Sequence, residues 1–138
     1  VTIDLGEWND IHPLNKKDVG KRLALAAMHT AHNEKDHVHS GPLYKSHEID
    51  GKHIIISFEN TGSGLTAKGG DQLNHFAIAD ESGIYRLANA KIDGDKVVVW
   101  HNDITHPVAV RYAWANNPIG ANLYNQESLP ASPFSTEE

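Results

Sequence analysis

The sequence contains no cysteine, so disulfide bonds, thiolate nucleophiles and Cys-ligated zinc are all excluded. It also has no run of about 18 apolar residues, which a membrane-spanning helix requires. Basic residues are scarce, since 12 Lys and Arg stand against 18 Asp and Glu, and the formal charge is −6. This balance argues against nucleic acid or an anionic membrane as a partner, because both attract basic surfaces. The 138 residues amount to about one domain.

A serine nucleophile is also missing from the usual sequence patterns. Neither a Gly-x-Ser-x-Gly elbow nor a Gly-Asp-Ser block occurs. Ser63 in Thr61-Gly62-Ser63-Gly64 comes closest, and we interpret it as part of a turn between strands. The first residue is Val1, without an initiator Met or a signal-peptide pattern, so we expect that an upstream segment was removed.

The first 32 residues are patterned like one unit of an α/β domain. Val1–Leu5 alternates apolar and polar residues, which predicts a short strand, and the loop 6–14 follows it. Asn15 is the predicted N-cap of a helix from Lys16 to about His29. The helix carries one wide apolar stripe, which predicts packing against more than one neighbour. Its members are Val19, Leu23, Leu25, Ala26, Ala27, Met28 and Thr30.

The remainder of the chain is patterned as strands. Residues 33–42 are polar, His-rich and unpatterned, which indicates a linker. Short strands with frequent turns then follow from Leu43, as is typical of an antiparallel sandwich or barrel. The predicted strands are 44–49 and 53–58 around Asp50-Gly51, 91–92 and 96–100 around Asp93-Gly94-Asp95, 75–79, and 108–114 with Val108, Val110, Tyr112 and Trp114 inward and Arg111 outward. Residues 115–138 are predicted to form an irregular tail laid over a surface.

The loop Asn9-Asp10-Ile11-His12-Pro13 is the stretch most suggestive of chemistry. It lies between a predicted strand and a predicted helix, where α/β enzymes usually place functional residues. A carboxylate two residues before a histidine can reach the ring, fix its tautomer and leave the other ring nitrogen as a general base. The alternative is a solvated loop histidine, and the pattern Asp-x-His-Pro does not decide between the two.

Two further groups have both a structural and a functional interpretation. Four clustered histidines could ligate a metal, but no carboxylate or Cys completes a recognised spacing, so we interpret them as solvated and expect no metal. Three aromatic residues on predicted strands could stack on sugar rings, but core packing explains them as well. The histidines are His29, His32, His37 and His39, and the aromatic residues are Trp100, Tyr112 and Trp114.

Several blocks spread along the chain resemble the C-terminal segment of bacterial sialate O-acetylesterases, in the SGNH (GDSL-type) hydrolase superfamily. Taken together the blocks are specific, whereas Asp-x-His-Pro alone would not be. They are Thr2-Ile3-Asp4-Leu5-Gly6, the loop 9–13, residues 15–24, Ser57-Phe58-Glu59-Asn60-Thr61-Gly62-Ser63-Gly64-Leu65, Arg111-Tyr112-Ala113-Trp114, Asn122-Leu123-Tyr124-Asn125 and Leu129-Pro130-Ala131-Ser132-Pro133-Phe134.

The resemblance implies an α/β fragment followed by an antiparallel all-β, sandwich-like domain. Residues 1–32 would be the last strand, catalytic loop and helix of a three-layer SGNH hydrolase domain, 33–42 a linker, and 43–138 the β-rich domain. His12 would be the general base and Asp10 its partner. The superfamily usually spaces this pair as Asp-x-x-His, which would place Asn9 at the acid position, but the esterases resembled here use the shorter spacing.

The resemblance also implies what the intact protein would do. It would remove acetyl groups from sialic acid with a serine nucleophile located in an N-terminal part, without metal or organic cofactor, in the periplasm or outside the cell. The 138-residue chain alone would be inactive. An acetylxylan esterase and a non-catalytic carbohydrate-binding β-module remain the alternatives. We also expect another polypeptide segment or a second copy to cover the apolar stripe of the helix.

Overall fold

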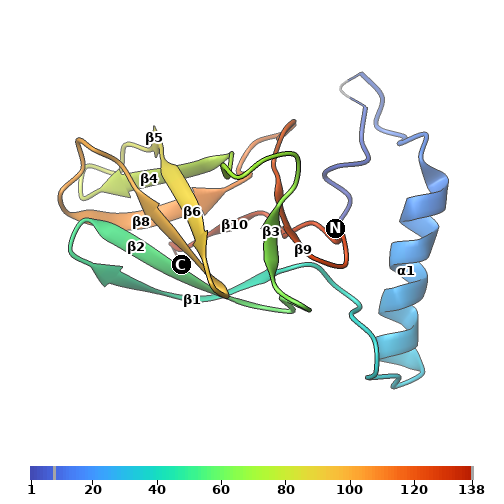
Figure 1. Ribbon diagram of the computed structural model, residues 1–138. Coiled ribbons are helices and arrows are strands. Elements are labelled where there is room, and N and C mark those ends of the chain that lie inside the picture. The colour runs from blue at the N-terminus through green and yellow to red at the C-terminus, as the bar shows by residue number, and fades with distance from the viewer. Residues whose placement is uncertain (8, 138) are drawn as a thin grey trace.

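The computed structural model describes residues 1–7 and 9–137, so Trp8 and Glu138 lie outside the described residues. One helix, α1 (Lys16–Ala31), stands beside a larger body of strands, and the N-terminal segment lies between them (Figure 1). The strands are β1 (Leu43–Asp50), β2 (His53–Glu59), β3 (Leu65–Ala67), β4 (Phe76–Asp80), β5 (Arg86–Leu87), β6 (Asn89–Asp93), β7 (Lys96–Trp100), β8 (Pro107–Tyr112), β9 (Leu123–Asn125) and β10 (Phe134–Ser135).

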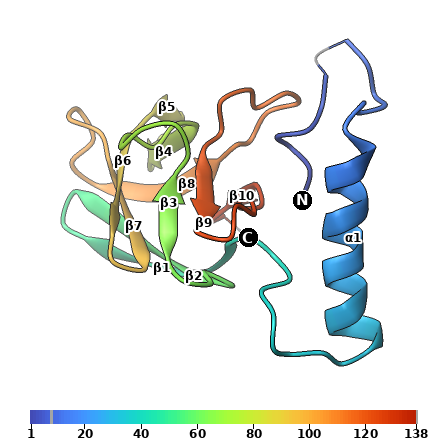
Figure 2. The same ribbon diagram turned by 45° about the vertical axis from the view of Figure 1, so that its right-hand side comes forward.

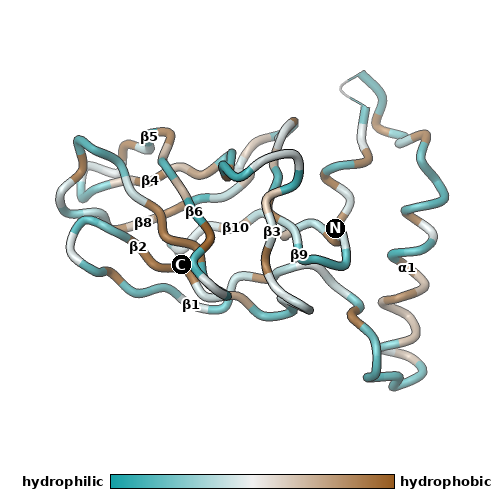
Figure 3. Tube along the Cα trace, in the orientation of Figure 1, coloured by the Kyte–Doolittle hydropathy of each residue, from teal (hydrophilic) through white to brown (hydrophobic). Residues whose placement is uncertain are grey.

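Two antiparallel sheets enclose the hydrophobic core. The first has the strand order β1-β2-β7-β6, the second β10-β8-β4-β5, and β3 pairs with β9 beside them. Apolar segments, coloured brown in Figure 3, occur along strands of both sheets. The buried side chains of the two sheets form one contiguous hydrophobic cluster. The first sheet contributes Ile54, Ile56, Val97 and Val99 to it, and the second contributes Phe76, Ile78, Val110, Tyr112 and Phe134.

The prediction that residues 1–32 form an α/β fragment of a three-layer hydrolase domain is wrong. Within the described residues the chain is mostly antiparallel β-sheet with a single 16-residue helix, and no α/β layer of the SGNH type is present. Residues 1–5 form a turn closed by a hydrogen bond of 3.1 Å from the Leu5 amide to the Thr2 carbonyl. A strand must pair its backbone groups with a neighbouring strand, and the described chain offers none to this segment.

The two Asp-Gly hairpins are confirmed. In β1–β2 the residues Asp50 and His53 are paired, so Gly51 is the first residue of a two-residue turn and has a φ of +57°. Asp93 and Lys96 pair in the same way across Gly94, whose φ is +64°. Glycine adopts this left-handed conformation at no steric cost, and such turns match the twist of paired strands.

The strict alternation predicted for 108–114 is wrong at both ends. Val110 and Tyr112 are buried, but Val108 and Trp114 are 41% and 60% exposed. The pairing of β4 with β8 skips Val108, so a bulge shifts the alternation before Val110. At the other end the strand stops at Tyr112, because Ala113 has a φ of +50° and redirects the chain.

The C-terminal segment is not a surface tail. It contributes β9 and β10, and Leu123, Ala131 and Phe134 belong to the core. Asn125 is also fully buried, and its side chain joins three segments. Its amide donates to the carbonyls of Ser40 and Asn60 at 3.0 and 3.3 Å, and its oxygen accepts from the Leu129 amide at 2.9 Å.

The predicted helix and its cap are confirmed. The Asn15 side chain accepts a hydrogen bond from the Asp18 amide at 3.1 Å, which satisfies one of the free N–H groups of the first turn. None of the helix residues is fully buried, and Leu23 in the apolar stripe is 66% exposed. The described part of the chain therefore leaves this stripe largely uncovered. In that part, no helix is long and apolar enough to cross a membrane.

Candidate functional site

Asp10 and His12 lie in contact in the loop before α1. One carboxylate oxygen of Asp10, Oδ1, accepts a hydrogen bond from the His12 amide at 2.8 Å and lies 3.3 Å from His12 Nδ1. Between Glu7 and Asp10 the backbone turns back on itself, because these two residues form an isolated antiparallel β-bridge. The side chains of His12 and Asp10 remain 81% and 47% exposed. The pair is thus formed by local chain geometry and is open to a reactant.

This arrangement suits an acid–base role for His12. A carboxylate beside Nδ1 favours the tautomer with its proton on that nitrogen and stabilises the imidazolium once the ring gains a second proton. The other nitrogen, Nε2, is then free to accept a proton from a reacting group. Asn9 is exposed on the same loop, but the contact to His12 is made by Asp10.

An ion pair anchors the segment that carries the loop. The two terminal guanidinium nitrogens of Arg22 donate to the Asp4 carboxylate, Nη1 at 2.6 Å and Nη2 at 2.8 Å. Nη1 also donates to the Val1 carbonyl at 2.8 Å. The Tyr124 hydroxyl of β9 donates to the second oxygen of Asp4 at 3.0 Å. Asp4 therefore ties α1 to the β-rich part, and the loop with Asp10 and His12 runs between Asp4 and α1.

The pKa values in this anchor follow from its partial burial. Burial alone would raise the pKa of the Asp4 carboxyl, but the hydrogen bonds from Arg22 and Tyr124 and the charge of Arg22 outweigh it, so the pKa is lowered. Burial and the Asp4 charge raise the pKa of Tyr124, which stays protonated as the donor. Asp4 thus contributes stability at pH values above its ordinary pKa of 3.8, and the contribution is lost as the pH falls through the lowered value.

Asp4→Asn is expected to weaken the attachment of α1 by about 2 kcal/mol above pH 3.8, since it removes charge-assisted hydrogen bonds from Arg22. Amide hydrogen exchange in α1, corrected for intrinsic rates, measures this opening. In the unsubstituted chain the opening free energy should fall as the medium becomes acidic, whereas in the variant the fall should be smaller, because only the Asp18 carboxylate of α1, whose pKa is lowered by its hydrogen bond to Asn15, still contributes to it. Glu34→Gln, at an exposed carboxylate after the helix, is the matched control. Equal exchange in the two variants would contradict the anchor.

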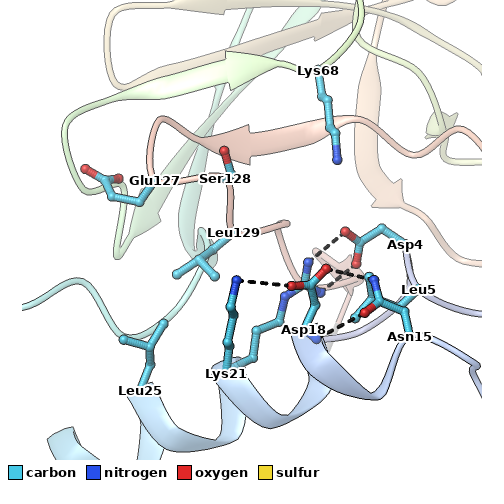
Figure 4. A pocket seen from close by; sticks show the side chains of 11 residues that line it. Asp4, Leu5, Asn15, Asp18, Lys21, Leu25, Lys68, Glu127, Ser128 and Leu129 are labelled. Atoms are coloured by element: carbon cyan, nitrogen blue, oxygen red, sulfur yellow. Dashed lines mark hydrogen bonds and ion pairs between the residues drawn. The ribbon is translucent and has the colours of Figure 1, made fainter.

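Two hollows flank this region. A cleft of about 520 Å³ lies between α1 and the loop after β9, with Asp18 and Lys21 on the helix side and Glu127 and Leu129 opposite (Figure 4). A second hollow, of about 480 Å³, lies between the loop that precedes α1 and residues 115–118, and Asp10 is one of the residues that line it. His12 lines neither of these two hollows, and its side chain is 81% exposed.

The histidine cluster is formed by three of its four predicted members. The rings of His29 and His39 stack at 3.5 Å, and His37 meets His29 edge-on at 6.4 Å while its Nε2 lies 3.1 Å from the Leu25 carbonyl. Desolvation and the neighbouring His39, Lys35 and His37 lower the pKa of His29. Among the described residues, no group of three or more His, Asp or Glu side chains could hold a metal ion. The cluster thus attaches the linker to α1.

The other candidates occupy separate places. Ser63 lies in a turn and its hydroxyl donates to Glu127 at 2.6 Å, so it is not paired with His12. Tyr112 is buried in the core, and its hydroxyl oxygen accepts a hydrogen bond of 2.9 Å from the Leu123 amide. Trp114 is exposed, and Trp100 is half-buried on the outer face of the first sheet. The aromatic residues therefore do not form one common surface.

Sequence reasoning missed the anchor residues Asp4, Arg22 and Tyr124 as a group. Asp4 and Arg22 are 18 residues apart, and Tyr124 is 120 residues from Asp4, so no local spacing could join them. The available signal was only that all three fall within the sequence blocks of the resemblance. Asn125 was missed for the same reason, since its partners Ser40 and Asn60 lie 85 and 65 residues away in the sequence.

No family model matches the sequence, and neither does any curated protein. A solved structure, in contrast, is similar to nearly the whole chain. The structure concerned is XAC1771, described as a novel carbohydrate acetylesterase from Xanthomonas citri, with 46% sequence identity and a TM-score of 0.92. The match covers 97% of this chain and 31% of that chain, so the chain spans under a third of the length of this relative.

Proposed function

We propose that this chain is part of a carbohydrate O-acetylesterase and supplies the general base of its active site, His12, together with the carboxylate of Asp10. The observation that carries the proposal is the contact between Asp10 and His12, with Nδ1 beside a carboxylate and a highly exposed ring. The relation to a carbohydrate acetylesterase over nearly the whole chain supports it. The nucleophile would be a serine on a segment of the enzyme outside these 138 residues.

The proposed reaction follows the general serine-hydrolase sequence. The serine oxygen attacks the acetyl carbonyl while His12 accepts its proton, and His12 then returns that proton to the leaving sugar oxygen. Water, deprotonated by the same histidine, releases acetate from the acyl-serine. Asp10 stabilises the imidazolium in both half-reactions. The exposure of His12 supports this division of labour, because the ring must reach groups that this chain does not carry.

The proposed substrate, location and division into units rest on the resemblance to sialate O-acetylesterases. It supports an acetylated sialic acid as the substrate and a periplasmic or extracellular location. It also supports treating 1–32 as a unit that works with the nucleophile-bearing part, joined through 33–42 to the β-rich unit 43–138. Acetylated xylan is the second candidate substrate, because the description of the Xanthomonas citri relative names carbohydrates in general.

A segment exchange tests this proposal. The 138-residue chain alone is expected to release no acetate from acetylated sialic acid or from acetylated xylo-oligosaccharides. A chimera in which this chain replaces the aligned segment of the Xanthomonas citri acetylesterase should recover hydrolysis, because 46% identity and a TM-score of 0.92 allow the same docking. Acetate release measures both. Turnover by the chain alone would refute the missing nucleophile, and a folded but inactive chimera would refute the shared role.

A further inference from the structure

The outer face of the first sheet carries an ordered array of side chains unrelated to the Asp10–His12 loop. Along β2, Ile54 and Ile56 point into the core, so His53 and Ile55 point outward. The strand register places Asp50 and Trp100 beside His53 in one row. The next row contains Glu48, Ile55, Val98 and Lys91.

These rows enclose a shallow hollow of about 280 Å³. Its floor is apolar and aromatic, and its rim carries charged groups. The side chains that line it are Asp50, His53, Ile55, Lys91, Asp93, Val98 and Trp100. The Trp100 and His53 rings meet edge to face, with centroids 6.0 Å apart and an interplanar angle of 67°. This contact holds the half-buried indole in one orientation on the sheet.

The chemistry of the hollow matches the two faces of a pyranose ring. The C–H groups of a sugar pack on an indole and on the methyl groups of Ile55 and Val98, while carboxylates on the rim accept hydrogen bonds from its hydroxyls. Two carboxylates, Asp50 and Asp93, stand against one ammonium group, Lys91. Carboxylates therefore outnumber ammonium groups in the lining, which disfavours an anionic sugar.

We propose that this hollow binds a neutral pyranose unit of a saccharide, as a non-catalytic site. In Figures 1 and 2 the β1–β2 hairpin, next to which Trp100 lies, points away from α1, so the hollow and the Asp10–His12 loop lie at opposite ends of the molecule. The two sites share no residue. A site of this kind would hold a polysaccharide while a separate centre acts on it. The binding itself does not depend on the proposed esterase function.

Calorimetric titration of the 138-residue chain tests the inference. The probes are xylohexaose and cellohexaose as neutral sugars and N-acetylneuraminic acid as the anionic one. At least one neutral hexasaccharide is expected to bind saturably at millimolar concentration. Trp100→Ala should lower that affinity about tenfold or more, and Trp100→Phe should retain part of it, because an aromatic face remains. The circular dichroism spectrum verifies that each variant is folded.

Trp114→Ala is the matched control, since Trp114 is an indole at the protein surface that lies outside the hollow. It should leave the affinity unchanged. The inference is overturned if neither hexasaccharide binds, if Trp114→Ala weakens binding as much as Trp100→Ala, or if N-acetylneuraminic acid binds more tightly than both. Sedimentation equilibrium adds one further outcome. A dimer that Trp100→Ala dissociates would identify the face as a self-association surface and would equally overturn the inference.

Discussion

His12→Ala in the chimeric acetylesterase is expected to lower kcat for acetate release by about 10³-fold or more. Without the imidazole, the serine oxygen keeps its proton during attack and the sugar oxygen leaves without a proton donor. Because the His12 side chain is 81% exposed and lies beside Asp10 of its own loop, its removal should leave the core unchanged. The loss should therefore appear in kcat, with an unaltered circular dichroism spectrum.

Substitutions beside His12 separate the two possible acid positions. Asp10→Asn should lower kcat by about 10²-fold or more, since the amide neither fixes the tautomer nor stabilises the imidazolium. Asn9→Ala should have little effect, because the contact to His12 Nδ1 comes from Asp10. His106→Ala, at another exposed histidine, is the matched control. A fully active His12→Ala chimera would exclude this residue as the base, and a large loss in Asn9→Ala would exchange the roles of Asn9 and Asp10.

Asn125→Ala is expected to lower the free energy of unfolding by about 3 kcal/mol. The substitution leaves the carbonyls of Ser40 and Asn60 and the amide of Leu129 without their partner in a buried place. An unsatisfied buried polar group costs about 1–3 kcal/mol, and relaxation of the chain recovers part of the sum. Asn125 is fully buried, so water does not replace the lost bonds without a local rearrangement.

Denaturant unfolding followed by circular dichroism measures this loss. Asn116→Ala, at an exposed position of the same C-terminal segment, is the matched control and should change stability by less than about 0.5 kcal/mol. Asn125→Asp keeps the oxygen that accepts from Leu129 and loses the donor, so it should remain strongly destabilising. If Asn125→Ala and Asn116→Ala unfold at the same denaturant concentration, the buried amide does not hold the three segments together.

The features predicted correctly from the sequence are those that neighbouring residues determine. The helix begins at Lys16 because Asn15 caps it, and the hairpins turn at Gly51 and Gly94 because glycine accepts a positive φ. The contact of Asp10 with His12 belongs to the same class, since two residues of separation suffice to form it. These interactions need no knowledge of the remaining fold.

The features predicted wrongly depend on distant parts of the chain. Val1–Leu5 has the alternation of a strand, but a strand also requires a pairing neighbour, and Asp4 is held instead by Arg22 and Tyr124. Val108 alternates correctly in sequence but falls at a bulge, which only the pairing with β4 reveals. The apparent tail has no regular period because its buried residues fill gaps between two sheets.

The uncovered helix also has a consequence for how the chain responds to heating. Since α1 buries no side chain completely, its opening is governed by its cap, the Asp4 anchor and the histidine contacts, and not by the cohesion of the sandwich. We therefore expect the segment bearing Asp10 and His12 to open at a lower free energy than the sheets. Under the proposed function, the acid–base pair would lose its geometry by local opening at temperatures where the sheets are still intact, and binding of a nucleophile-bearing part would stabilise it by mass action.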